Sequence, residues 1–115
     1  MNVKLDPKLL KKNSEEVARL LKSVAHPKRL QMLCALTEGP KNVGELTQIC
    51  GGAQSLVSQF LMRMRMEGLV EAKKEGQFVA YEIKDLRTLA LMKSLFDIFC
   101  HSQTTKVLKA GGIEK

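Results

Sequence analysis

The stretch Asn42–Val70, NVGELTQICGGAQSLVSQFLMRMRMEGLV, decides the fold that we expect for this chain. Asn42 is followed three residues later by Glu45, which is the capping-box pattern of a helix N-terminus. Gly51 and Gly52 then interrupt the helix, as a tight turn between two helices requires. The stretch therefore predicts a helix-turn-helix.

The second helix of this pair is predicted from about Ala53 to Glu67. Its opposite faces differ, because apolar residues at helical spacing should pack inward while the other face is small, polar and basic at its C-terminal end. The inward residues are Leu46 and Ile49 in the first helix and Val57, Phe60, Leu61 and Met64 in the second. Such an outer face suits base edges and phosphates in the DNA major groove, and an ordinary solvated helix surface is the alternative. The candidate DNA-binding residues on it are Gln54, Ser55, Ser58, Gln59 and Arg63.

The composition predicts one folded domain covering residues 1–115, because 44% of the residues are hydrophobic. A formal net charge of +7 and a pI of about 9.5 favour a polyanionic partner, either nucleic acid or anionic lipid. No apolar run is long enough to cross a membrane, and residues 1–12 lack a signal-peptide core. We therefore expect a cytoplasmic protein whose cysteines Cys34, Cys50 and Cys100 are not a disulfide framework.

Two helices are predicted before the helix-turn-helix. The first begins at Asp6, which precedes a proline, or at Asn13, and it ends near Ser23. The second opens at His26, which we expect to cap the helix rather than bind a ligand because no second histidine stands nearby.

Within the second helix, one face is predicted to carry the apolar residues together with a cysteine. Its members are Leu30, Leu33, Cys34 and Thr37, with Met32 and Leu36 beside them. Lys28 and Arg29 are expected on the solvated face, near the phosphates of a bound nucleic acid.

Two strands, Leu69–Ala72 and Phe78–Ile83, should follow as a hairpin with residues 73–77 at its basic tip. A hairpin directly after a recognition helix is a winged helix. Phosphate or the minor groove is the expected target of Lys73, Lys74 and Gln77. The alternative is a soluble turn whose lysines protect an edge strand.

Asp85 is predicted to cap a last helix whose apolar stripe is long for a small domain. The stripe consists of Leu89, Met92, Leu95, Phe96 and Phe99. Part of it should bury against a second subunit, together with the first helix. The expected fold is mainly α with a small β-hairpin, a winged helix-turn-helix in one domain. Its parts are an N-terminal dimerisation helix (1–24), the helix-turn-helix (42–67), the wing (69–84) and a C-terminal dimerisation helix with a tail (85–109).

Four short motifs resemble those of the ArsR/SmtB family of winged-helix repressors, over about Glu15 to His101. They are His-Pro-x-Arg-Leu, Val-Gly-Glu-Leu, Ser-Leu-Val-Ser-Gln and Glu-Gly-Leu-Val. The resemblance implies a homodimeric DNA-binding regulator and not an enzyme. Its two recognition helices would enter successive major grooves of a palindromic operator, about 34 Å apart. One departure is Ala53, which stands where the family usually has a capping Ser or Thr.

The inducer sites known in the family are matched only in part. The arsenic- and cadmium-type Cys-x-Cys signature is missing, because the corresponding segment is Glu45-Leu46-Thr47-Gln48. Zinc- and nickel-type members carry paired histidines on the last helix, where this chain has Asp85, Asp97 and His101. A metal site or another cofactor is therefore not expected, and a metal site shared between two subunits is the alternative.

The sequences around Cys34 and Cys100, QMLCAL and FDIFCH, resemble the persulfide-responsive branch of the family, which includes the regulators BigR, SqrR and HlyU. The resemblance implies that these two cysteines are sensing thiols which sulfane sulfur links, so that the repressor leaves its operator. His101 and Lys106 are near enough in sequence to stabilise a thiolate at Cys100. For each thiol the alternative is a small apolar core residue, and Cys50 is expected to be a bystander.

The expected partners are double-stranded DNA, a second copy of the chain and persulfides, with no membrane.

Four other interpretations remain open at this point. Two keep the fold and the DNA: a metal- or general redox-responsive repressor, and an activator that displaces a nucleoid protein. An enzyme using Cys100 as nucleophile would need a base and an orienting group, and the only histidine besides His101 is His26. A protein-interaction module would show no salt-dependent affinity for DNA.

Overall fold

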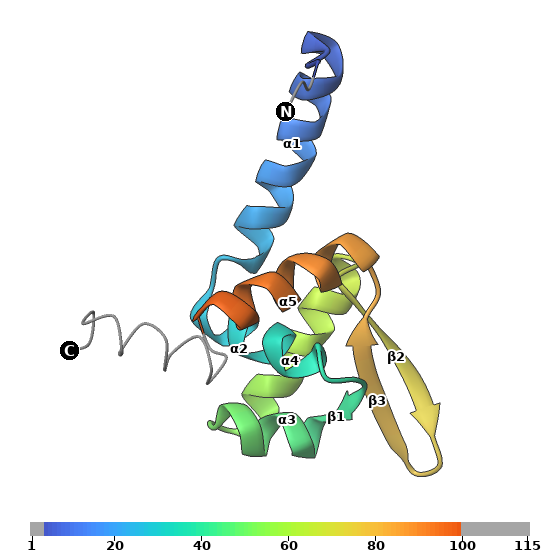
Figure 1. The fold of residues 1–115 in the computed structure, drawn as a ribbon. Helices are drawn as coiled ribbons and strands as arrows, with labels where there is room; N and C mark the ends of the chain where they lie inside the picture. The colour runs from blue at the N-terminus through green and yellow to red at the C-terminus, as the bar shows by residue number, and fades with distance from the viewer. Residues whose placement is uncertain (1–3, 100–115) are drawn as a thin grey trace, which may run out of the picture.

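The computed structural model describes residues 4–99, which form five helices and a three-stranded antiparallel sheet (Figure 1). The helices are α1 (Pro7–Val24), α2 (Pro27–Leu36), α3 (Val43–Cys50), α4 (Gln54–Met66) and α5 (Leu86–Phe99). The strands are β1 (Lys41–Asn42), β2 (Val70–Glu75) and β3 (Phe78–Ile83). This order is that of a winged helix-turn-helix, which confirms the predicted fold class. No helix in the described range is long and apolar enough to span a membrane.

The helix starts follow the capping residues in the sequence. The Asp6 carboxylate and the His26 Nδ1 each accept a hydrogen bond from a backbone N–H in the first turn, at 3.0 and 3.1 Å. Asn42 and Glu45 complete the capping box of α3 with bonds of 2.8 and 2.9 Å. The start at Asn13 is wrong, and the capping role of His26 is confirmed. Ala53 is the N-cap of α4, and no side chain forms a capping hydrogen bond there. Neither Gln54 nor Ser55 therefore replaces the Ser or Thr hydroxyl that the family usually has at this position.

The core lies where α2, α3, α4 and α5 pack together and against the sheet. Its fully buried side chains include Met32, Leu33, Leu46, Val57, Leu61, Met64, Val70 and Met92. The inner face of α4 is the predicted one. On α3, however, Ile49 is 56% exposed and Cys50 is buried instead. The reason is spacing, because residues four apart on a helix share a face, so Cys50 aligns with Leu46.

The buried residues of helix α2 do not lie along a single stripe but on several adjacent faces of the helix. Met32, Leu33 and Leu36 are buried, whereas Leu30 and Cys34 are only half-buried. Because α2 contacts α3, α5 and β3, its adjacent apolar residues reach different neighbours. The predicted face through Leu30 and Cys34 is therefore not the most buried one, and Cys34 is not a fully buried core residue.

The wing differs from its prediction in two ways. Glu75 pairs with Phe78, so β2 runs to Glu75 and the loop is only Gly76-Gln77, with Gly76 at φ +62°. The residues 73–75 belong to a strand rather than to the tip, because charged side chains are tolerated on an exposed strand. Strand β1, which pairs with β3, was not predicted, since two residues are too few to show a periodicity.

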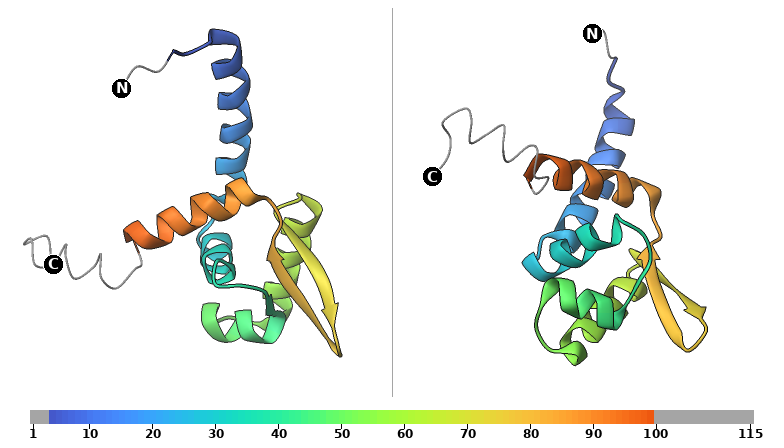
Figure 2. Two further views of the ribbon diagram at one scale, coloured as in Figure 1. Left: turned by 45° about the vertical axis from the view of Figure 1, so that its right-hand side comes forward. Right: turned by 60° about the horizontal axis from the view of Figure 1, so that its bottom comes forward.

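Helix α1 projects away from the other elements as an arm (Figures 1 and 2). Its last residue, Val24, is buried, but its apolar stripe remains on the surface. Leu9, Leu10, Val17 and Leu21 are each about half exposed. On α5, Ile98 and Phe99 are likewise exposed. Of the predicted apolar stripe of α5, Met92 is fully buried, Leu89, Leu95 and Phe96 are half-buried, and only Phe99 is exposed. Most of that stripe therefore packs within the chain, and the exposed apolar surface lies on α1 and at the end of α5.

A buried hydroxyl on α5 provides a test of the core. Thr88 is fully buried, and its Oγ1 has no hydrogen-bond partner in the described part of the chain. A Thr88→Val substitution removes an unsatisfied polar group at constant shape, so we expect the free energy of unfolding to rise by about 1 kcal/mol. Urea unfolding at one fixed protein concentration measures the change.

The matched control for this test is Thr47→Val. The Thr47 Oγ1 donates to the Val43 carbonyl at 2.8 Å, so the same substitution there breaks a hydrogen bond and should destabilise the protein by about 1 kcal/mol. Equal losses of stability in both variants would contradict the assignment of Thr88 as unsatisfied.

Candidate functional site

The outer face of α4 presents the predicted DNA-binding residues to solvent. Gln54, Ser55, Gln59 and Arg63 are exposed, and Ser58 is half-buried. Arg63 and Arg65 lie in the last turn, where positive charge is favourable beside the negative end of the helix dipole. The helix therefore combines an apolar inner face with a polar and basic outer face.

The two lysines of the wing have different surroundings. The Lys73 ammonium lies 2.7 Å from the Glu82 carboxylate on the neighbouring strand. This hydrogen bond raises the pKa of Lys73 and lowers the pKa of Glu82, so each remains charged. Lys74 is exposed and projects to the other side of β2, because successive residues of a strand alternate. Gln77 is in the loop, so the three predicted wing residues do not share one face.

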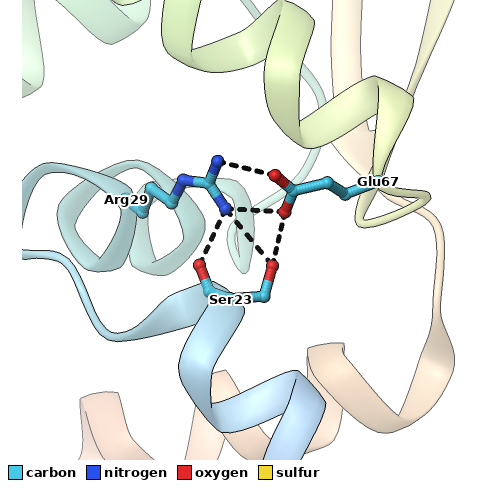
Figure 3. Close-up of polar contacts among 3 residues, drawn as sticks. All are labelled: Ser23, Arg29 and Glu67. Atoms are coloured by element: carbon cyan, nitrogen blue, oxygen red, sulfur yellow. Dashed lines mark hydrogen bonds and ion pairs between the residues drawn. The ribbon is translucent and has the colours of Figure 1, made fainter.

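Three side chains from three helical segments meet where the C-terminal end of α4 lies beside the end of α1 (Figure 3). Arg29 Nη1 and Nη2 bind the two carboxylate oxygens of Glu67 at 2.7 and 2.9 Å, which is a bidentate ion pair. Nη1 also donates to the carbonyl of Ser23 at 2.8 Å, and the Ser23 hydroxyl donates to Glu67. We call these three residues the Arg29 cluster. They join the last turn of α1, the first turn of α2 and the C-cap of α4.

The expectation that Arg29 is solvated and near phosphate is wrong. Its side chain is only 12% exposed, because Glu67 and the end of α1 cover the guanidinium. The hydrogen bond from Arg29 lowers the pKa of Glu67 to about 2, and the bond from Ser23 acts in the same direction. The sequence motifs contained both partners, but nothing in them indicated that they pair across 38 residues.

A cavity of about 520 Å³ lies between α2, α3 and α5. Cys34 of α2, Cys50 and Ile49 of α3, and Phe96 of α5 are among the side chains that line it. Cys100, the second predicted sensing thiol, lies outside the described residues, as do His101 and Lys106. Cys50 was expected to be a bystander, and its place at the same cavity as Cys34 could not be predicted, because the meeting of α2 with α3 is a feature of the packed fold.

Lys28 is also not simply solvated. Its Nζ donates to the carbonyl oxygen of Cys50 at 3.0 Å, which connects the start of α2 to the end of α3. Burial raises the pKa of the Cys50 thiol, and the nearby charge of Lys28 opposes that shift. Cys50 is therefore mainly a thiol near neutral pH, with a cation beside it.

The part of the chain that the structure describes contains no cluster of metal ligands. No three His, Cys, Asp or Glu residues among residues 4–99 come together as a metal ion would require. His26 is used as a cap, and its ring packs on Phe60 with centroids 4.9 Å apart. Asp85 accepts from the Arg87 backbone N–H at the start of α5, which lowers the pKa of Asp85 and fits its predicted capping role.

These features define a winged-helix protein with a polar recognition helix, a class that binds DNA. Residues 26–72 match the family model described as "Bacterial regulatory protein, arsR family". The chain is 41% identical over 92 residues to the HTH-type transcriptional regulator YgaV of Escherichia coli, covering 79% of this chain and 93% of that protein. The protein belongs to the ArsR family of transcriptional regulators, whose matched members are regulators and not enzymes.

Solved structures agree with this assignment. The transcriptional repressor BigR from Xylella fastidiosa superposes with a TM-score of 0.75 at 36% identity, covering 85% of this chain and 100% of that chain. Reduced HlyU from Vibrio cholerae also gives a TM-score of 0.75 at 36% identity, with 82% and 99% covered. The chain therefore falls within the BigR and HlyU branch of the family, as the sequence motifs predicted.

The Arg29 cluster predicts a specific acid sensitivity. Because the pKa of Glu67 is lowered from 4.5 to about 2, its stabilisation is complete above about pH 4.5 and is lost as the pH falls towards 2. Glu67→Gln should flatten the pH dependence of stability in that interval. It should also lower the free energy of unfolding near neutral pH by about 1 kcal/mol, a modest value because Glu67 is 44% exposed.

Urea unfolding at a series of pH values measures this dependence. Glu38→Gln is the matched control, because Glu38 also loses one carboxylate but forms a longer, exposed ion pair with Lys41 at 3.6 Å. The control should keep the acid slope of the parent. If both variants show the parental slope, Glu67 is not the group responsible.

Proposed function

We propose that this protein is a homodimeric repressor whose affinity for its operator falls when Cys34 and Cys100 react with a persulfide. The observation that carries the proposal is the position of Cys34, half-buried at a cavity that Phe96 also lines. Phe96 and Cys100 belong to one short run of sequence, FDIFC, at the end of the last predicted helix. The similarity to BigR and HlyU supports the proposal, because the cysteine contexts of this chain resemble the branch of the family that includes these two regulators. Such a regulator acts in the cytoplasm, where the chromosome is.

The proposed chemistry needs two thiols and a sulfane sulfur donor. The Cys34 thiolate attacks the terminal sulfur of a persulfide, RSSH, and the thiol RSH leaves, so that Cys34 carries a persulfide. The Cys100 thiolate then attacks the sulfur next to the terminal one, and the terminal sulfur leaves as HS⁻ with the electron pair. The two thiols are oxidised to a sulfur bridge while the sulfane sulfur is reduced to sulfide. Further donor lengthens the chain, and a longer bridge spans thiols too far apart for a disulfide.

The bridge would act on DNA binding through α2. This helix carries Cys34 on one side and Arg29 on another, and Arg29 is paired with Glu67 at the C-cap of α4. A bridge between α2 and the C-terminal region favours one arrangement of these helices over another. Because a ligand shifts an equilibrium only by its differential affinity for two states, the bridged state must hold the recognition helices in a geometry that fits DNA less well.

The dimer is proposed from exposed apolar surface. The arm formed by α1 displays a stripe of leucines and a valine, and Phe99 of α5 is 73% exposed. Exposed apolar surface of this kind on adjacent helices is typical of a subunit interface. A two-fold dimer then places its two α4 helices on the half-sites of a palindromic operator.

A metal-responsive repressor is the second candidate, and the described residues lack the clustered ligands that it needs. The relative from Vibrio cholerae is named a transcriptional activator, so the direction of regulation depends on the promoter as well. Whether the protein represses or activates transcription, the DNA-binding residues that we propose are the same. They are Gln54, Ser55, Ser58, Gln59 and Arg63 on α4, with Lys73, Lys74 and Gln77 on the wing.

Phosphate contacts can be counted from the salt dependence of binding. If Arg63 and Lys74 each bind a phosphate, Arg63→Ala or Lys74→Ala should lower the slope of log K against log salt by about one per DNA half-site. Fluorescence anisotropy with a fragment of the protein's own promoter measures the slope. Lys93→Ala, an exposed charge change on α5, is the matched control and should leave the slope unchanged.

The sensing thiols have their own test. Glutathione persulfide should weaken the promoter affinity of the parent protein by roughly tenfold or more. The variants Cys34→Ser and Cys100→Ser should both keep the affinity of the untreated protein after treatment. Peroxide and zinc are applied separately: loss of promoter affinity with peroxide would indicate a general redox-responsive repressor, and loss with zinc a metal-responsive one. If persulfide still releases DNA from a variant that combines Cys34→Ser with Cys100→Ser, the proposed function is refuted.

A further inference from the structure

The cavity beside Cys34 contains a second thiol that is present in the described structure. Cys34 lines it from the last turn of α2, and Cys50 lines it from the last residue of α3. Ile49 and Phe96 contribute apolar surface to the same space. Two cysteines from different helices therefore line one cavity, which gives Cys50 a reaction partner that its position in the sequence does not suggest.

The two thiols differ in their access to solvent. Cys34 is half-buried, whereas Cys50 is only 9% exposed. Burial raises the pKa of the Cys50 thiol, which makes it a slow nucleophile towards reagents in solution. Lys28, held by its bond to the Cys50 carbonyl, supplies a positive charge beside the thiol. Because both cysteines line one cavity, a reaction between them is intramolecular, which offsets a small thiolate fraction.

We propose that Cys50 is a resolving thiol for Cys34, which closes a sulfur bridge between α2 and α3 after Cys34 has gained sulfane sulfur. This inference rests on the proposed reaction of Cys34 with persulfides. The Cys50 thiolate attacks the sulfur next to the terminal sulfur of the chain on Cys34. A new S–S bond forms, the bond to the terminal sulfur breaks, and that sulfur leaves as HS⁻ with the electron pair. One added sulfur gives a disulfide, and two give a trisulfide.

The bridge to Cys50 would compete with the bridge to Cys100, because Cys34 supplies the attacked sulfur in both. The α2–α3 bridge links two helices of the DNA-binding half, next to the glycine turn that precedes α4. It therefore differs in position from a bridge that involves the C-terminal region. In the parent protein, Cys50→Ala should raise the yield of the bridge between Cys34 and Cys100.

The test uses the full chain with Cys100→Ser, which leaves Cys34 and Cys50 as its only thiols. The protein is treated with glutathione persulfide, trapped with iodoacetamide and analysed by intact and tryptic mass spectrometry. Trypsin places Cys34 in the peptide 30–41 and Cys50 in the peptide 42–63, so a bridge appears as two linked peptides. The matched control combines Cys50→Ala with Cys100→Ser, and circular dichroism checks that both variants are folded.

We expect most of the Cys100→Ser protein to give linked peptides, released sulfide and no thiol that iodoacetamide can trap. The control should instead carry an alkylated persulfide on Cys34. If Cys100→Ser also shows an alkylated persulfide on Cys34 and a plain alkylated Cys50, the inference is overturned while the proposed function stands. If Cys34 gains no sulfur in the parent or in either variant, both are overturned.

Discussion

The bidentate ion pair between Arg29 and Glu67 joins two helices that are 38 residues apart in the sequence. It fixes the start of α2 against the end of α4, and Ser23 adds the end of α1 to the same cluster (Figure 3). Because the guanidinium is nearly buried, loss of either partner would leave a desolvated charge or an unpaired acceptor. The ends of α1 and α4 and the start of α2 thus meet at one point, and the hydrogen bonds of this cluster connect them.

Helix α2 connects the proposed thiol chemistry to this cluster. In only ten residues it buries Met32 and Leu33 in the core, carries Arg29 in its first turn and places Cys34 at a cavity. A rigid helix transmits a displacement at one position to its other faces, because the packed core tolerates discrete arrangements rather than gradual deformation. In the proposed function, chemistry at Cys34 would therefore act on the helix whose Arg29 pairs with Glu67 at the C-cap of α4.

The sequence predicted the parts of the structure that depend on local patterns. Caps at Asp6, His26 and Asn42 mark helix starts because each side chain satisfies backbone groups of its own first turn. The inner face of α4 follows from helical periodicity, and the family motifs identified the winged helix. Relations between distant segments were not predictable in this way. The burial of Arg29 depends on Glu67 at the C-cap of another helix, and the position of Cys50 at the cavity that Cys34 lines depends on how α2 meets α3.

The most direct test of this account compares the persulfide response of the parent with that of Glu67→Gln. For each protein, the promoter dissociation constant is measured before and after treatment with glutathione persulfide, and the ratio gives the coupling between thiol chemistry and DNA binding. If the Arg29 cluster transmits the change from α2 to α4, the ratio should fall towards one in Glu67→Gln, although Cys34 still gains sulfur. A ratio equal to that of the parent, in a variant that is folded and equally modified, would contradict the account.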